Sequence, residues 1–327
     1  MPDPVLVTGA TGFVGSAVCR HLAQQGFEVR ALHRPTSGLS TLEGLRVDRR
    51  LGDILDPETL APSVGGVRWV FHAAAEAAYW RRRPEQVIRG AVEGTRNIVN
   101  ACVQAGVERL ILTSSMAALG VPRSGELLTE DHTFNLPAKR FPYGYAKRQA
   151  ELEALKAAGG SLEVVVVNPS IVIGAGDVHQ ISGSLVIQAA RGRTFLYTGG
   201  GTNIIHIDDV AAGHLAAAER GRSGERYLLG GENLTHLQLF TLLAEVVGSQ
   251  PPWLRLPDWA IEPVAASLDL ARRILPMPLD GNQLRLSRHR LFCDTAKARY
   301  QLGVVNRRPA RQAIVEALAW YRAHGVV

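Results

Sequence analysis

Tyr143 and Lys147 stand four residues apart in the segment that begins at Pro142. On a helix, this spacing places both side chains on one face. A free phenol has a pKa of about 10, which is too high for efficient proton transfer near neutral pH, and a neighbouring ammonium group lowers it. The pair therefore predicts an acid/base tyrosine assisted by a lysine, with a plain surface pair as the alternative. Tyr145 also competes, but Gln149 rather than a lysine follows it by four residues.

Hydroxyl side chains follow the apolar run 110–112 as Thr113, Ser114 and Ser115. If that run is a strand of a doubly wound sheet, these hydroxyls lie where ligands bind, beyond the carboxyl end of the strand. A hydroxyl there can donate a hydrogen bond to a carbonyl oxygen as negative charge develops on it. Capping of the strand end is the alternative for the serines taken alone. Together with the tyrosine–lysine pair, they predict a site for carbonyl chemistry.

Glycines recur every three residues between Thr8 and Gly15, after a short strand pattern and at the start of a helix-like segment. Gly9 permits a tight turn, Gly12 lets the backbone approach a pyrophosphate, and Gly15 allows the helix to pack closely on the strand. The amides and the positive dipole end of such a helix favour bound phosphates. The glycines alone are a weak signal, but their strand–turn–helix context predicts a dinucleotide-binding turn rather than a merely structural one. The residues that complete this cofactor-binding turn are Thr11, Phe13 and Val14.

The segment after the second predicted strand indicates which dinucleotide is preferred. A site for NAD usually has an acidic residue there to bind the ribose hydroxyls, and residues 32–37 contain none. Arg34 can instead pair with a 2′-phosphate, because a guanidinium offers a fork of charged donors. Ser37 can add a hydroxyl. These residues favour NADP(H) over NAD(H), and a solvated loop arginine is the alternative for Arg34.

The elements that position these residues are alternating strands and helices. The helix-like segments 13–25, 85–105 and 144–158 separate strand-like runs, which are 5–7, 28–32, 46–51, 68–72, 110–113 and 164–167. Strands that alternate with helices of this length indicate βαβ units and a parallel sheet covered on both faces. The predicted fold class is therefore α/β, with a doubly wound parallel sheet of the Rossmann type.

The regular alternation of strand-like and helix-like segments ends after about residue 170. Segment 235–247 resembles an amphipathic helix with Thr235 as its N-cap, and the prolines of segment 251–281 break helices into short pieces. We therefore expect an NADP(H)-binding Rossmann core with the catalytic residues over 1–170. We expect a smaller, irregular and mainly substrate-binding part over 171–327, from which about 203–230 returns to the core sheet.

Composition excludes several classes of protein. With 327 residues, 46% of them hydrophobic and 20% charged, the chain is neither disordered nor, with 33 glycines, collagen-like. Its three cysteines have no metal-ligand spacing, so we expect no metal site and a reducing compartment. We see no signal peptide and no apolar run of about 18 residues, so we expect a cytoplasmic protein without a membrane span.

The net charge of +6 is a mild excess spread along the chain. An arginine run, 81–83, has no basic stripe elsewhere to join, so we interpret it as a solvated loop and expect no nucleic-acid partner. Tyr79 and Trp80 precede that run, and they either line the mouth of the substrate site or pack in the core. Met116, directly after the serines, is a further candidate for contact with a small-molecule substrate.

These motifs together resemble the extended short-chain dehydrogenase/reductases of the NAD-dependent epimerase/dehydratase superfamily, over essentially the whole chain. Within that superfamily, Asn168-Pro169-Ser170 and segment 230–235 resemble the dihydroflavonol-4-reductase-like and hopanoid-associated sugar epimerase branch. The segments that carry the superfamily resemblance are 8–15, 52–53, 72–75, 94–95, 113–115, 142–147 with 150–151, and 206–211.

The resemblance implies a role for each matching residue. Ser115 would polarise the carbonyl group, Tyr143 would be the acid/base, and Lys147 would lower the pKa of that tyrosine and hold the ribose. The superfamily commonly forms dimers, and helices 92–105 and 144–158 would pair across a two-fold axis into a four-helix bundle. The further cofactor contacts would be Asp53 at the adenine with Ile54 beside it, Ala73 and Ala74 along the cofactor, Thr113, and Pro169 and Ser170 at the nicotinamide.

The chain departs from the superfamily pattern in three places. Ala91 replaces a frequent asparagine, Asn203-Ile204-Ile205 precedes His206 where nucleotide-sugar enzymes usually have an arginine, and segment 173–200 contains no asparagine. A nucleoside-diphosphate sugar is therefore less favoured than a less charged carbonyl compound. We expect an NADPH-dependent carbonyl reductase or alcohol dehydrogenase. The alternatives are an NAD-dependent sugar epimerase/dehydratase and a non-catalytic NAD(P)-sensing protein, which has no need of the tuned tyrosine.

Overall fold

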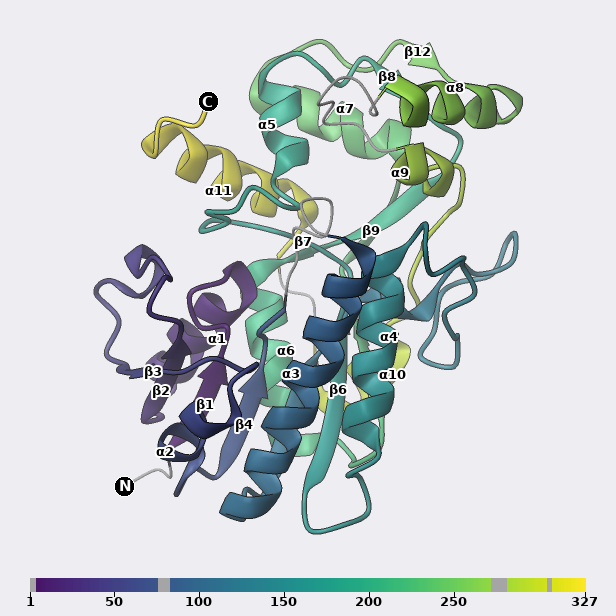
Figure 1. Cartoon of the computed structure of the whole chain (residues 1–327). Coiled ribbons are helices and arrows are strands. Elements are labelled where there is room, and N and C mark those ends of the chain that lie inside the picture. The colour runs from purple at the N-terminus through teal and green to yellow at the C-terminus, as the bar shows by residue number, and fades with distance from the viewer. Residues whose placement is uncertain (1–3, 76–82, 272–280, 305–307) are drawn as a thin grey trace.

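The computed structural model describes residues 4–75, 83–271, 281–304 and 308–327. Its centre is a seven-stranded sheet in the order β10, β6, β5, β4, β1, β2, β3, and every pairing in that sheet is parallel (Figure 1). In chain order, the strands of this sheet are β1 (Val5–Thr8), β2 (Val29–His33), β3 (Asp48–Leu51), β4 (Trp69–His72), β5 (Arg109–Thr113), β6 (Glu163–Pro169) and β10 (Arg226–Leu229).

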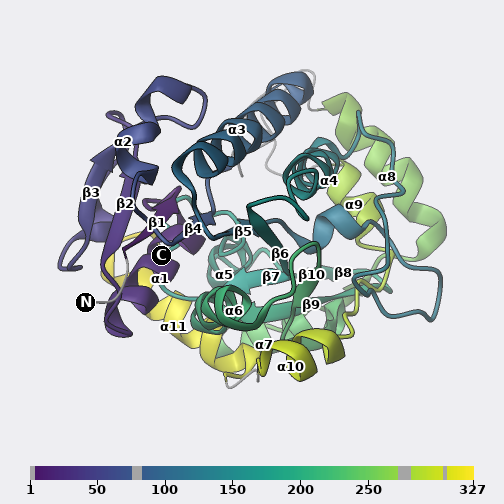
Figure 2. The same ribbon diagram turned by 90° about the horizontal axis from the view of Figure 1, so that it is seen from below.

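Helices cover both faces of the sheet (Figure 2). Helices α3 and α4 pack together on one face, and α1 and α6 pack together on the other. Alternate side chains of β1 point to opposite faces of the sheet. Val5 and Val7 pack with α1 and α6, whereas Leu6 packs with α3. Burial on both faces explains why the strands are apolar throughout. These helices are α1 (Phe13–Gln24), α3 (Pro84–Ala105), α4 (Pro142–Leu155) and α6 (Ile207–Arg220).

The strand order reverses at β1, which pairs with β2 on one side and β4 on the other. This is the topological switch point of a doubly wound sheet, where ligands bind beyond the carboxyl ends of the strands. Thr8, the last residue of β1, is in register with Leu32 of β2 and His72 of β4. The predicted Rossmann-type sheet is therefore confirmed, and the glycine turn shares one edge with the segments that follow β2 and β4.

The predicted boundaries of two helices can be compared with the structure. Helix α4 begins at Pro142, two residues before the predicted start, because proline fits a first helical turn whose N–H groups have no helical partner. Helix α7 (His236–Val247) follows Thr235, whose hydroxyl accepts a hydrogen bond from the amide of Gln238 at 3.2 Å, so the predicted cap is confirmed.

Apart from α6, β10 and α10 (Ala296–Leu302), which pack on or belong to the main sheet, the elements after β6 form a C-terminal lobe above the end of that strand (Figure 1). The segment around 203–230 is divided, because β9 belongs to the lobe, whereas α6 covers the main sheet and β10 pairs with β6. The short helix α10 also packs on α6. The elements of the lobe are β7 (Ile171–Ile173), α5 (Ser184–Ala190), β8 (Leu196–Tyr197), β9 (Gly201–His206), β11 (Glu232–Thr235), α7, β12 (Leu254–Arg255), α8 (Asp258–Ala271), α9 (Gly281–Leu286) and α11 (Ala310–Ala323).

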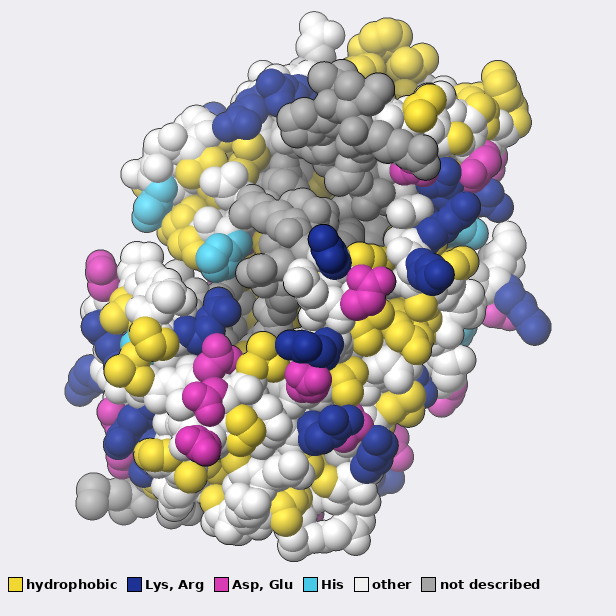
Figure 3. Space-filling view, viewed as in Figure 1, with side chains coloured by type: hydrophobic (Ala, Val, Ile, Leu, Met, Phe, Trp, Pro, Cys, Tyr) yellow, Lys and Arg dark blue, Asp and Glu magenta, His cyan; other side chains and the backbone are white. Residues whose placement is uncertain are grey.

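Charged side chains of both signs are interspersed on the face shown in Figure 3. Ion pairs account for part of this pattern, since Glu153 of α4 pairs with Arg96 of α3 at 2.8 Å and with Lys156 at 2.6 Å. Positive charge is therefore balanced locally over α3 and α4. Among the described residues, no helix is long and apolar enough to cross a membrane.

Candidate active site

The glycine turn between β1 and α1 depends on two glycines. Gly9 has φ of +65°, and a Cβ atom there would lie 2.7 Å from the Cα atom of Ala74. A Cβ atom on Gly15 would lie 2.1 Å from the carbonyl oxygen of Gly9, so this helix position also excludes a side chain. Gly12 is the N-cap of α1 and makes no side-chain cap, which leaves the amides of the first turn facing the edge of the sheet. The turn thus has the backbone donors that a pyrophosphate requires.

The segment after β2 lies beside this turn. Arg34 is exposed, Ser37 is half-buried, and the amide of Ser37 donates to the carbonyl oxygen of Arg34 at 3.0 Å. The hydroxyl of Thr41 donates to the carbonyl oxygen of Thr11 at 3.2 Å and ties the segment to the glycine turn. An exposed arginine therefore follows β2 at the sheet edge where the adenosine half of a dinucleotide would bind.

Asp53 and Ile54 follow β3 in a turn held by hydrogen bonds. The carboxylate of Asp53 accepts the amide of Leu55 at 2.9 Å, and the side chain of Asn97 donates to the carbonyl oxygen of Ile54 at 2.9 Å. Gly94 of α3 leaves space for Ile54, because a Cβ atom there would lie 2.5 Å from Cδ1 of Ile54. Helix α3 thus fixes the backbone of Ile54, whereas the amide of Asp53 donates to the hydroxyl of Thr59 at 3.0 Å.

A buried histidine fixes the segment after β4. His72 Nδ1 is 2.7 Å from the hydroxyl of Thr8, and that hydroxyl accepts the amide of Ala74 at 3.3 Å. Burial, and secondarily the charge of Lys147, lowers the pKa of His72 to about 3, so the ring is neutral at physiological pH. The result is that Ala73 and Ala74 are held directly against the glycine turn.

Lys147 lies on α4 and is 7% exposed. Its ammonium donates to the carbonyl oxygen of Thr113 at 2.8 Å, which ties α4 to the end of β5. Burial lowers the pKa of Lys147 to about 8, and the charge of Glu151 acts in the opposite direction. The hydroxyl of Thr113 points elsewhere, because it is 2.8 Å from Nε2 of His214. Thr113 therefore contributes its carbonyl group to the site.

Ser115 follows β5 and caps the short 3-10 helix Met116–Leu119. Its hydroxyl oxygen accepts the amide of Ala117 at 3.2 Å, so its hydrogen is available for donation to another acceptor. Half-buried Tyr143 lies one helical turn before Lys147. The next residue, Gly144, packs so closely on this 3-10 helix that a Cβ atom there would lie 2.5 Å from the carbonyl oxygen of Ala117. The fold thus brings the three predicted catalytic residues to one edge.

Two hydroxyls at the same edge lack partners among the described residues. Ser114 Oγ and Ser170 Oγ are both buried, and they follow the adjacent strands β5 and β6. Pro169 ends β6 in register with Leu229 of β10. Buried hydroxyls nearly always find a hydrogen-bond partner. The orphaned hydroxyls and the glycine turn therefore fit a dinucleotide that brings polar groups of its own.

The three substrate candidates have different outcomes. Met116 is 6% exposed and belongs to a hydrophobic cluster that includes Leu128 and Cys293. Its contact with a substrate stays a prediction. Tyr79 and Trp80 lie outside the described residues.

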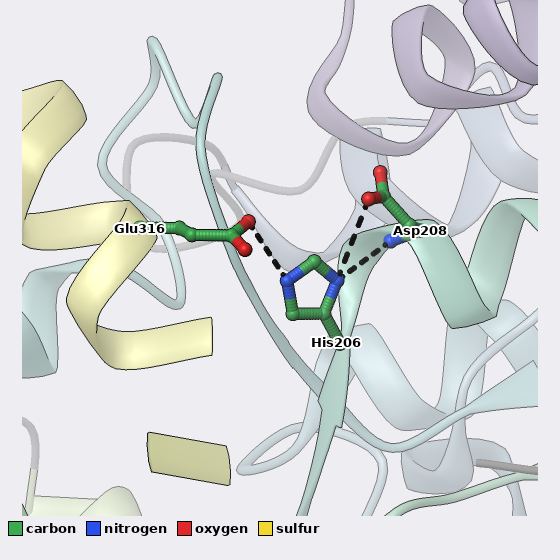
Figure 4. Close-up of side chains that lie close together, drawn as sticks. All are labelled: His206, Asp208 and Glu316. Carbon is green, nitrogen blue, oxygen red and sulfur yellow. Dashed lines mark hydrogen bonds and ion pairs between the residues drawn. The ribbon is translucent and has the colours of Figure 1, made fainter. Parts of the chain in front are cut away.

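A cluster of histidine and carboxylates in the described part of the chain has the proximity that a metal site requires, and it comprises His206, Asp208 and Glu316 (Figure 4). Hydrogen bonds already explain its arrangement. His206 Nδ1 accepts the amide of Asp208 at 3.1 Å, and Nε2 lies 2.9 Å from the carboxylate of Glu316. His206 thus caps α6 and anchors α11, which agrees with a structural role.

Buried histidines should make the protein sensitive to acid. Burial lowers the pKa of His72 to about 3 and of His214 to about 4, while an unfolded histidine has a pKa near 6.5. Below pH 6.5 the unfolded chain therefore binds more protons, and stability is lost as the pH falls toward 4. At pH 4.5 each should lower the free energy of unfolding by about 2 kcal/mol. Urea unfolding measures the free energy of unfolding between pH 7 and pH 4.5. This free energy should fall less steeply with decreasing pH in His214→Gln than in wild type, whereas His324→Gln, at an exposed position, should match wild type. The same dependence on pH in all three proteins would contradict the assignment.

Sequence reasoning missed two buried polar residues, one on α4 and one near the end of β6. Glu151 is fully buried, and Asn168 contacts both Glu151 and the backbone of Ser115. A signal for Glu151 was present, since it follows Lys147 by four residues and therefore shares its helix face. Asn168 offered no such spacing, because its partners come from other strands and helices.

The sequence model of the NAD dependent epimerase/dehydratase family matches residues 5–230. The chain therefore belongs to this family. A putative dihydroflavonol 4-reductase from Synechocystis sp. is 37% identical, with 100% of this chain and 97% of that protein covered. The sterol demethylase protein B of Methylococcus capsulatus is 31% identical, with 98% and 99% covered.

A solved structure gives the same result for the fold. The crystal structure of gox2253 has a TM-score of 0.87 and 39% sequence identity, with 99% of each chain covered. Other relatives are named as a ketoreductase and as cinnamoyl-CoA reductases. The family and these relatives indicate an NAD(P)-dependent oxidoreductase or epimerase.

Proposed function

We propose that the protein is an NADPH-dependent carbonyl reductase that acts on a ketone or aldehyde. The observation that carries the proposal is the buried ammonium of Lys147, held on the carbonyl of Thr113 one helical turn from Tyr143. An ammonium in this position stabilises a phenolate and so makes the phenol a better proton donor near neutral pH. Relatives named as reductases support the proposal.

The residues of the chain would divide the reaction between them. A reduced nicotinamide cofactor, when held at the glycine turn, would supply the hydride that reduces the carbonyl group. Ser115 donates its hydroxyl hydrogen to the carbonyl oxygen, because the amide of Ala117 already occupies a lone pair of the serine oxygen. Tyr143 then transfers its phenolic proton to that oxygen, and Lys147 offsets the negative charge left on the tyrosine.

We assign substrate binding mainly to the C-terminal lobe, which stands over the edge that carries these residues. The lobe and the core would enclose a carbonyl compound of low charge, since the segment 173–200 offers no asparagine for a diphosphate. We further propose a homodimer that forms through α3 and α4, because these helices expose Val103 and Leu152. We also propose a cytoplasmic location.

Arg34 is the residue that we propose selects NADP(H). Arg34→Ala should raise the dissociation constant of NADP⁺ at least tenfold, about 1.4 kcal/mol, since it removes a charge-assisted contact with the 2′-phosphate. The dissociation constant of NAD⁺ should change less than twofold. Titration calorimetry of both cofactors tests this, with Arg46→Ala, another exposed arginine, as control. Equal losses for NADP⁺ and NAD⁺ would refute the phosphate contact.

Absorbance at 340 nm separates the proposed reductase from an epimerase. The panel comprises dihydroquercetin, a 2-alkyl-3-oxo ester, cinnamaldehyde and a nucleoside-diphosphate 4-keto sugar. A reductase consumes NADPH in stoichiometric amounts with one of the first three compounds. An epimerase/dehydratase shows no net consumption and retains cofactor through purification, and that outcome would replace the proposal.

A further inference from the structure

A buried polar cluster lies directly behind the proposed catalytic residues, and it consists of Glu151, Asn168, Arg148 and Arg226. We infer that Asn168 and Glu151 are positioning residues that clamp Ser115 to the helix carrying Tyr143 and Lys147. The inference rests on the proposed function, because it concerns how that site is held together. It adds two residues that do not themselves touch a substrate or cofactor.

The clamp is built on the side-chain amide of Asn168, which is fully buried. Its Nδ2 atom donates to the carbonyl oxygen of Ser115 at 3.0 Å and to Oε1 of Glu151 at 2.6 Å. An amide nitrogen has two hydrogens, and these two bonds use both. The reversed amide would set its oxygen against two other oxygens, so the two acceptors fix its orientation. One side chain thus joins the loop after β5 to α4.

Glu151 is the fixed end of the clamp. The carboxylate is 0% exposed, and its Oε2 atom lies 3.0 Å from Arg148 and 3.3 Å from Arg226. Two guanidinium groups compensate the loss of hydration that burial of a carboxylate entails. Arg226 in turn donates to the carbonyl oxygen of His132 at 2.9 Å, so the cluster also holds the chain that leads into α4. Glu151 therefore cannot move without breaking several charged contacts.

Packing alone does not require such a cluster, because well-packed apolar side chains often replace a buried ion pair at no loss of stability. What apolar residues cannot supply is the bond to the backbone of Ser115 and the negative charge beside Lys147. Glu151 follows Lys147 by one helical turn, and its charge raises the pKa of Lys147 against the larger effect of burial. The neighbouring His72 and His214 are neutral near pH 7, because burial lowers the pKa of each. Glu151 thus supplies the negative charge that acts on Lys147.

Asn168→Asp tests the clamp by kinetics. This variant keeps the shape of the side chain but places carboxylate oxygen against the carbonyl of Ser115 and against Glu151. With the compound of the panel that wild type reduces fastest, we expect kcat to fall at least tenfold, while the dissociation constant of NADPH stays within threefold. Thermal unfolding is measured in parallel. An unchanged kcat, or a loss of NADPH binding in proportion to kcat, would overturn the inference.

Glu151→Gln tests it without any turnover. The chain has only four lysines, so ¹³Cε-lysine NMR can follow the ammonium of Lys147, assigned with Lys147→Arg. Without the negative charge of Glu151, Lys147 should lose its proton at a pH at least 0.5 lower, about 0.7 kcal/mol. Glu153→Gln is the matched control, since Glu153 lies on the same helix and pairs with Arg96 and Lys156 instead.

The two arms distinguish the inference from the proposed function. If no carbonyl compound is reduced, the proposed function fails, and the NMR arm still tests the role of Glu151. A titration of Lys147 that is the same in Glu151→Gln as in wild type would overturn the role of Glu151. A lower midpoint in Glu151→Gln, with no change of Lys147 in Glu153→Gln, supports it.

Discussion

Tyr143→Phe should lower kcat about 10³-fold while leaving the dissociation constant of NADPH within twofold of wild type. The substitution removes the phenolic oxygen and retains the ring, so α4 and its contact with the 3-10 helix should persist. General acid catalysis contributes typically 10²- to 10⁴-fold, which sets the expected loss. Cofactor binding should survive because the glycine turn lies between β1 and α1, whereas Tyr143 lies on α4. Steady-state kinetics and fluorescence titration of NADPH give the two quantities.

Tyr145→Phe is the matched control for this prediction. Tyr145 lies on the same helix, two residues later, and its ring is tilted by 59° against that of Phe134, with ring centroids 5.8 Å apart. The loss of its hydroxyl should change kcat less than threefold. If Tyr145→Phe were the inactive variant and Tyr143→Phe the active one, the acid/base would be misassigned.

Gly15→Ala should damage cofactor binding and stability together. The added Cβ atom would stand 2.1 Å from the carbonyl oxygen of Gly9, and backbone cannot yield as a flexible side chain can. Relief would require α1 to move away from the turn, which displaces the amides proposed to hold the pyrophosphate. We expect a dissociation constant for NADPH raised at least tenfold and a free energy of unfolding lowered by about 2 kcal/mol, a usual size for overpacking.

Gly90→Ala is the control for this substitution. Gly90 lies inside α3, and a Cβ atom there would meet nothing within 4 Å. Alanine favours a helix by up to about 1 kcal/mol over glycine, so this variant should be slightly more stable and bind NADPH normally. Calorimetric unfolding and cofactor titration are measured on both variants. Normal NADPH binding by Gly15→Ala would contradict the assigned role of the turn.

The sequence sufficed for the core because its signals are local. The strand before Gly9, the helix that begins at Phe13 and the spacing of Tyr143 and Lys147 on one helix each depend on neighbouring residues, and all appear in the structure. The parallel order of the strands follows from their alternation with helices. A parallel sheet then places the ends of its strands at one edge, so Ser115 could be grouped with the glycine turn.

The C-terminal lobe and the support of the site could not be predicted in the same way. Strands β9 and β11 pair antiparallel across an intervening helix and a strand of the other sheet, and β8 pairs with the distant two-residue strand β12. Such pairings leave no period in the sequence. The partners of Asn168 are likewise 53 and 17 residues away, so only the folded chain shows that it joins Ser115 to Glu151.

Transfer of deuterium from NADPH labelled at C4 tests the central claim most directly. The enzyme is incubated with the pro-R and, separately, the pro-S deuterated cofactor and with the carbonyl compound that it reduces, and the alcohol is analysed by mass spectrometry. The account predicts one deuterium on the carbinol carbon from one of the two labelled cofactors. Tyr143→Phe should form about 10³-fold less of this labelled alcohol in the same time. An alcohol without deuterium from either cofactor would contradict hydride transfer and with it the proposed function.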